Sequence, residues 1–83
     1  MVLGNGITTI PANAFYYCSN LTSVTISASV TEIGKYAFYY CEKLTDIHFS
    51  GTKAQWNAIS KDSGWNTYTG SYVIHCTDGD ITK

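Results

Sequence analysis

The chain has 83 residues, of which 45% are hydrophobic and 13% are charged, and its formal net charge is −1. This length predicts one small domain with a narrow margin of stability, and the many Tyr, Thr, Ser and Gly residues favour β-structure over a helical bundle. The basic residues are all lysines that stand singly, which excludes nucleic acid and anionic membranes as expected partners.

No apolar run approaches the roughly 20 residues of a membrane-spanning helix. The first ten residues also lack the basic start and long apolar centre of a signal peptide. Residues 1–3 align with the last half of a later strand, so we expect the chain to begin inside a repeat. An open amino-terminal end of this kind predicts self-association through that end.

Residues 7–29 align with residues 30–52, and the run Ala-Phe-Tyr-Tyr-Cys occurs at 14–18 and again 23 positions later at 37–41. Apolar positions recur between the two copies while the positions between them change, as Thr25 does against His48. A repeat of this length with Leu-x-x-Val-x-Ile at its centre, here Leu21-x-x-Val24-x-Ile26, is typical of a leucine-rich repeat.

Alternating apolar residues predict short strands around residues 23–27 and 46–50, each with one buried and one exposed face. The exposed sheet face then carries six polar side chains: Ser23, Thr25, Ser27, Asp46, His48 and Ser50. We interpret each Ala-Phe-Tyr-Tyr-Cys run as a short helical turn whose first tyrosine, Tyr16 or Tyr39, faces solvent. Residues 7–10 and 30–33 are expected to be brief extended segments.

Residues 52–55, Thr-Lys-Ala-Gln, have the spacing of a capping box and predict a helix that buries Trp56 and Ile59 and stops at residues 62–64. Alternation over residues 72–76 predicts a last strand, and the residues after it are expected to be a polar tail. The chain therefore divides into leucine-rich repeats at 1–50, the first truncated, and a carboxy-terminal capping segment at 51–83.

The succession Leu-Thr-Ser-Val-Thr-Ile, Ser-Val-Thr-Glu-Ile-Gly-Lys-Tyr-Ala-Phe-Tyr-Tyr-Cys and Leu-Thr-Asp-Ile resembles the BspA-type leucine-rich repeat of bacterial surface proteins over residues 7–50. The tail is similar to the closing segment of that family. The expected fold is a short right-handed solenoid of α/β type, with about two full repeats, a short parallel sheet and helical turns. The resemblance implies an extracellular or cell-surface location in a bacterium, binding of host or neighbouring-cell macromolecules, and no catalytic residues.

The cysteines and histidines are the residues of this sequence that could form a disulfide or a metal site. Cys18 and Cys41 hold the same place in successive repeats, about one strand spacing of ~4.8 Å apart, so both structural thiols and a disulfide stay open. His48 and His75 fall on the sheet face near Asp46, where a metal site could begin, but incidental placement is the preferred interpretation. No metal and no cofactor is predicted.

The sequence lacks the motifs of nucleophilic catalysis and of phosphate binding, so an enzyme is not expected. The first hypothesis is a protein-interaction or adhesion module that uses the six-residue sheet face. The alternatives are glycan binding through Trp56, Trp65 and Tyr68, or a purely structural solenoid cap that binds nothing.

Overall fold

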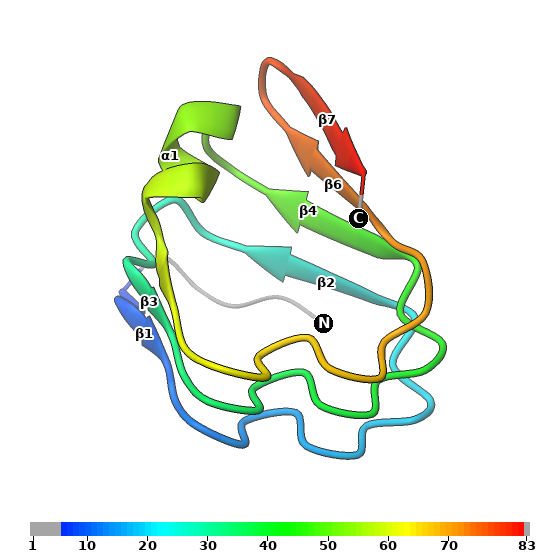
Figure 1. The fold of residues 1–83 in the computed structure, drawn as a ribbon. Helices are drawn as coiled ribbons and strands as arrows, with labels where there is room; N and C mark the ends of the chain where they lie inside the picture. The colour runs from blue at the N-terminus through cyan, green and yellow to red at the C-terminus, as the bar shows by residue number, and fades with distance from the viewer. Residues whose placement is uncertain (1–5, 83) are drawn as a thin grey trace.

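The structure, a computed structural model, describes residues 6–82. Their secondary structure is one helix among short strands (Figure 1). In chain order the elements are β1 (Thr9–Ile10), β2 (Ser23–Ile26), β3 (Glu32–Ile33), β4 (Asp46–Phe49), α1 (Lys53–Ala58), β5 (Ser60–Lys61), β6 (Val73–Cys76) and β7 (Gly79–Thr82).

The strands form two sheets. The larger has the order β2-β4-β6-β7, with β7 antiparallel to β6 and the other pairs parallel. The smaller is wholly parallel, in the order β1-β3-β5, and it forms from the extended segments that the sequence predicts plus residues 60–61. The chain runs from a small-sheet strand through a row of turns to a large-sheet strand and back, three times over (Figure 1).

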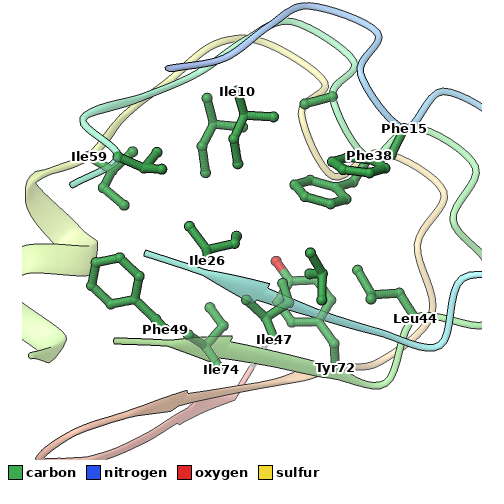
Figure 2. Close-up of a cluster of buried hydrophobic side chains, with 14 of the residues drawn as sticks. Ile10, Phe15, Ile26, Phe38, Leu44, Ile47, Phe49, Ile59, Tyr72 and Ile74 are labelled. Atoms are coloured by element: carbon green, nitrogen blue, oxygen red, sulfur yellow. The ribbon is translucent and has the colours of Figure 1, made fainter. Parts of the chain in front are cut away.

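Apolar side chains from the two sheets and the turns fill the space that the chain encloses (Figure 2). Val24, Ile26 and Ile47 have no exposed surface, because period-two alternation points them inward from β2 and β4. Phe15 and Phe38 stack at a centroid distance of 5.0 Å between successive turns, as the repeat spacing predicts. The apolar half of the repeat therefore forms the core, which leaves function to the outward side chains.

The predicted helical turns at the Ala-Phe-Tyr-Tyr-Cys runs are wrong. Residues 12–17 form consecutive turns without a helix. Tyr16 N donates to Asn13 O at 3.2 Å within one copy, whereas Phe15 N donates to Ala37 O at 2.7 Å in the next copy. Because alternate amides are used between copies, the chain cannot complete a helical ladder, in which each amide bonds four residues back.

This geometry changes which tyrosines face solvent. Tyr17, Tyr40 and Tyr68 hold equivalent positions with φ of 60°, 62° and 61°, in the left-handed region. Tyr17 is 53% exposed and Tyr16 is 45% exposed, so both tyrosines of the first Ala-Phe-Tyr-Tyr-Cys run face outward. Tyr39, in contrast, is only partly exposed because its neighbours cover it.

The predicted capping box is confirmed. Thr52 Oγ1 accepts from Gln55 N at 3.2 Å, and Gln55 Oε1 accepts from Thr52 N at 2.8 Å. Trp56 is buried, as predicted, but α1 ends at Ala58 rather than at residues 62–64. It ends early because β5 begins at Ser60 and pairs with β3, which starts a third passage of the chain through the row of turns.

The predicted last strand is confirmed as β6, but the predicted polar tail is wrong, because residues 79–82 form β7. Asp78, in the turn between the two strands, accepts a hydrogen bond from Lys53 N at 2.9 Å. The hairpin is thereby tied to the start of α1. The prediction that residues 1–3 complete an earlier strand lies outside the described residues.

Candidate functional site

The outward residues of the large sheet form rows across its strands. One row runs through Ser23, Asp46, Val73 and Thr82, and the next through Thr25, His48, His75 and Asp80. Four of the six predicted sheet-face residues, Ser23, Thr25, Asp46 and His48, are thus brought together. Ser50 is exposed just beyond the end of β4.

Ser27 does not belong to the exposed face. It is 7% exposed, and its hydroxyl contacts Ser29, whose backbone N lies 3.2 Å away and whose Oγ lies 3.0 Å away. Beyond the end of β2 the chain turns inward, so the alternation that exposes Thr25 no longer holds. Asp80 and Thr82 were not predicted to lie on this face, although Asp78-Gly79 after an alternating strand is a hairpin signal.

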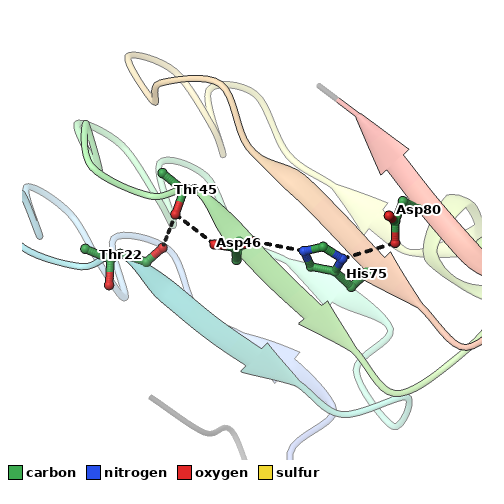
Figure 3. A network of polar contacts seen from close by, with 5 residues as sticks. All are labelled: Thr22, Thr45, Asp46, His75 and Asp80. Atoms are coloured by element: carbon green, nitrogen blue, oxygen red, sulfur yellow. Dashed lines mark hydrogen bonds and ion pairs between the residues drawn. The ribbon is translucent and has the colours of Figure 1, made fainter.

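His75 is the centre of a polar network on this face (Figure 3). Its Nε2 lies 2.8 Å from Asp46 Oδ1, and its Nδ1 lies 3.1 Å from Asp80 Oδ1. Thr45 Oγ1 donates to the second carboxylate oxygen of Asp46 at 2.9 Å. Three strands, β4, β6 and β7, are therefore joined by side chains as well as by backbone bonds.

These contacts shift the titration of both partners. The hydrogen bond to Asp46 raises the pKa of His75 from its ordinary value, and the bond to Asp80 adds to the effect. The hydrogen bond from His75, with that from Thr45, lowers the pKa of Asp46. The two carboxylates favour the charged form of His75 relative to a free imidazole, because only the imidazolium carries a proton on both ring nitrogens.

His48 stacks on His75 with ring centroids 4.9 Å apart, so the two histidines are neighbours, as the sequence predicts. Both nitrogens of His75 already face carboxylate oxygens. Within residues 6–82 no group of three or more His, Cys, Asp or Glu side chains is placed to hold a metal ion.

The three aromatic residues of the glycan alternative do not share a surface. Trp56 is 3% exposed and packs against Phe49, with centroids 5.3 Å apart, so its ring faces are covered. Trp65 is partly buried and meets Phe38 edge-on at 6.2 Å. Tyr68 is 58% exposed, but it lies against Tyr40, at 4.8 Å, rather than beside Trp56.

Tyr68 instead ends a column of stacked tyrosines along the row of turns. Tyr17 and Tyr40 stack at 4.5 Å with an interplanar angle of 6°, and Tyr40 meets Tyr68 at 40°. A second pair, Tyr16 and Tyr39, stacks beside them at 5.0 Å. This tyrosine surface was not predicted from the sequence, although the recurrence of Tyr-Tyr at the repeat spacing is a signal for it.

Comparison with known proteins agrees with the repeat pattern. The family model for the BspA type leucine rich repeat region (6 copies) matches residues 1–72. The chain belongs to this family. No curated protein and no solved structure matches it.

The BspA-type match extends beyond residue 50, through the third passage of the chain along the row of turns and up to the start of β6. That region is one in which the sequence shows little of the Ala-Phe-Tyr-Tyr-Cys pattern, but the backbone repeats. Phe38 N donates to Trp65 O at 2.7 Å, just as Phe15 N donates to Ala37 O. In residues 6–82 of this BspA-type chain, no helix is long and apolar enough to cross a membrane.

The three cysteines of the BspA-type chain are free thiols in the structure. Cys41 is fully buried, and its Sγ lies 3.1 Å from Phe15 O, to which it donates. Burial raises the pKa of the Cys41 thiol to about 11. This thiol therefore packs as a small core side chain, which corresponds to the first of the two alternatives that the sequence leaves open.

Proposed function

We propose that this BspA-type chain is a non-catalytic protein-interaction or adhesion module of a bacterial cell-surface or secreted protein, and that it forms part of a longer right-handed solenoid. The observation that carries the proposal is the in-register stacking of outward polar side chains across β2, β4, β6 and β7. Such a stack lets each repeat vary its outward residues without disturbing the core.

Small hydroxyl and carboxylate side chains make up most of the sheet face, which holds no Trp, Tyr or Arg of the kind that dominates binding hot spots. A partner would gain little from any single contact with Ser23, Thr25 or Asp46. Affinity would then accumulate over several repeats or several copies of the chain, as multivalent adhesion does.

The imidazole–carboxylate cluster supports the non-catalytic part of the proposal. A general base needs a ring nitrogen within reach of a substrate proton. Both nitrogens of His75 are held by Asp46 and Asp80, at 2.8 Å and 3.1 Å, and the pKa of His75 is raised. The cluster therefore connects strands rather than offering a free base.

The test uses beads coated densely with the protein, whose adhesion to cultured epithelial cells and to intact bacterial cells is counted. Thr25 and His48 face each other across β2 and β4, so Thr25→Lys plus His48→Lys adds two charges to the centre of the sheet face. We expect adhesion to fall at least about fivefold, because a docking partner would have to desolvate two ammonium groups at the centre of the face. Protease treatment of the cells should have the same effect.

The control places two lysines in the other sheet and, because one of them replaces a glutamate, changes the net charge by +3 rather than by +2. Glu32 and Ser60 are exposed partners across β3 and β5, and Glu32→Lys plus Ser60→Lys should leave adhesion unchanged. Thermal unfolding verifies that both double variants are folded. Equal loss in the two variants, or none in the first, would remove the sheet face from the proposal.

A further inference from the structure

The tyrosine column leads to a hollow at its carboxy-terminal end. The hollow has a volume of about 540 Å³ and is lined by Tyr40, Glu42, Tyr68, Thr69 and Gly70. This volume lies within the ~300–1,000 Å³ that small-molecule sites occupy. Its lining residues lie along the row of turns. The row of turns is on another side of the molecule from the large sheet (Figure 1).

Tyr68 offers the hollow an aromatic surface. Its ring contacts Tyr40 at 4.8 Å and Tyr39 at 5.5 Å, yet 58% of the residue stays exposed. Within the column this chain covers tyrosine faces with further tyrosine rings, as Tyr17 covers Tyr40 at 4.5 Å. The exposed ring of Tyr68 can therefore accept another flat group that packs as a ring would.

Glu42 adds a polar group to the same hollow. Its side chain is exposed, and among residues 6–82 no hydrogen bond or ion pair joins its carboxylate to another residue. Gly70 lies against the backbone of Glu42, where an added Cβ would come within 2.9 Å of Glu42 O. Gly70 thus lets residues 68–70 approach the backbone of Glu42 closely, and the exposed side chains of Glu42 and Tyr68 line one hollow.

We propose that this hollow binds a neutral carbohydrate, whose pyranose ring packs its C–H face on Tyr68 while adjacent hydroxyls donate to the Glu42 carboxylate. The weakly positive C–H bonds of a sugar suit the negative face of an aromatic ring. A carboxylate accepts up to four hydrogen bonds and so suits a pair of neighbouring hydroxyls.

A cationic ligand is the competing occupant, because tyrosine rings and a carboxylate also attract ammonium groups. Lys43, the next residue in the chain, carries the opposite charge, so residues 42–43 together have no net charge to attract a cation. The carbohydrate is therefore favoured. The site differs from the alternative based on Trp56 and Trp65, and it stands whether or not the sheet face binds a protein.

The test titrates ¹⁵N-labelled protein with maltopentaose, cellopentaose, chitopentaose and mannopentaose and follows the backbone amides. We expect at least one sugar to shift the amides of Tyr40, Glu42, Tyr68, Thr69 and Gly70, with a millimolar dissociation constant. Tyr68→Asn should weaken that binding at least about tenfold, because the stacking ring is lost. Asparagine tolerates the left-handed backbone of residue 68, so this variant should fold. Glu42→Gln should weaken binding as well.

Tyr17→Asn is the matched control, because Tyr17 has the same backbone conformation and a similar exposure but does not line the hollow. It should change the affinity for the pentasaccharide less than about threefold. No shift with any of the four sugars, or equal weakening by both asparagine variants, would overturn the proposal. Binding of tetramethylammonium at the same amides in place of sugars would also overturn it, in favour of a cation site.

Discussion

At the scale of single residues, the cluster of His75, Asp46 and Asp80 combines three separate segments of sequence. Its two contacts are partly exposed, with side-chain exposures of 34% for His75 and 43% for Asp46. Water and salt screen such pairs, so each contributes modestly to stability. The cluster nevertheless makes stability depend on pH in a direction that can be stated.

His75 has a raised pKa in the folded chain, so its contribution to stability is complete below about pH 6.5 and is lost as pH rises through that raised value. The pKa of Asp46 is lowered, so its contribution is present above about pH 3.9 and is lost as pH falls through the lowered value. We expect urea unfolding to show greatest stability from this cluster between those limits, with a decline as pH rises from about 6.5 through the raised pKa of His75 that His75→Gln abolishes. His48→Gln, which leaves the three residues in place, should keep the decline. The same decline in His75→Gln would contradict this assignment.

Cys41 is predicted to be the least reactive of the three thiols. It is fully buried, and at a pKa of about 11 it holds roughly a hundredfold less thiolate at neutral pH than a thiol at the ordinary 9.0. Iodoacetamide should therefore label Cys18 and Cys76 in the native protein and Cys41 only in urea, as mass spectrometry of the peptides can show. The native Cys41→Ala variant should be labelled at Cys18 and Cys76 to the same extent as the native wild-type protein. If Cys18 in the native protein is labelled only after reduction, Cys18 and Cys41 are joined in a disulfide and the prediction is wrong.

The sequence predicted which positions point inward, because burial of Val24, Ile26 and Ile47 follows from the two-residue period of a strand. It placed His75 on the same face as Asp46 but could not predict Asp80 as a second partner. That contact depends on β7, which brings Asp80 beside β6 by an antiparallel return. The prediction that Ser27 lies on the exposed face was wrong for a related reason, since alternation says nothing about where a strand ends.

At the scale of elements, the turns depend on close approach between successive copies of the chain. Gly34 is the clearest case, because a Cβ there would lie 2.4 Å from Ala12 N and 2.7 Å from Pro11 C. Backbone atoms cannot move aside as a flexible side chain can. The glycine therefore sets how tightly one copy packs on the preceding one.

Gly34→Ala is expected to lower the free energy of unfolding by about 1–3 kcal/mol, since the added methyl group forces two copies apart. Gly6→Ala is the matched control: nothing lies within 4 Å of a Cβ at that position, so a change below about 0.5 kcal/mol is expected. Urea unfolding measures both. Equal stability of the two variants would show that the turns tolerate wider spacing than the structure has.

The capping box of α1 could be predicted, because its Thr and Gln act on neighbouring amides. The helical turns at residues 14–18 and 37–41 could not be correctly assigned in the same way. A spacing of aromatic and small residues fits both a helix and consecutive turns, and the bonds that decide between them cross to another copy, as from Tyr17 N to Tyr39 O.

At the scale of the whole molecule, the repeat continues after its sequence pattern fades. Tyr17 and Tyr40 are 23 positions apart, whereas Tyr40 and Tyr68 are 28 apart, because α1 is accommodated before β5. Sequence alignment at a fixed spacing therefore finds two copies. The third, with Gly64 and Tyr68 at the left-handed positions, is recognised by its backbone.

One end of the stack leaves strand edges uncovered among the described residues. There β1 pairs only with β3, and β2 pairs only with β4. An apolar hollow of about 90 Å³ opens at this end, lined by Ile7, Thr9, Ile10, Pro11, Ala14 and Phe15. Unpaired edges beside apolar surface are templates for another chain.

We therefore expect the protein to self-associate through this end as its concentration rises from micromolar to millimolar. Thr9→Lys places a charge on the exposed edge of β1 and beside the hollow, so it should shift the population back to monomer, because docking would bury an unpaired ammonium group. Sedimentation velocity over that concentration range measures the shift. Thr77→Lys adds the same charge at the exposed turn between β6 and β7, away from β1, and should leave association as it was. A wild-type protein that stays monomeric at millimolar concentration would show that this end is not adhesive, and equal loss of association in both variants would place the contact elsewhere.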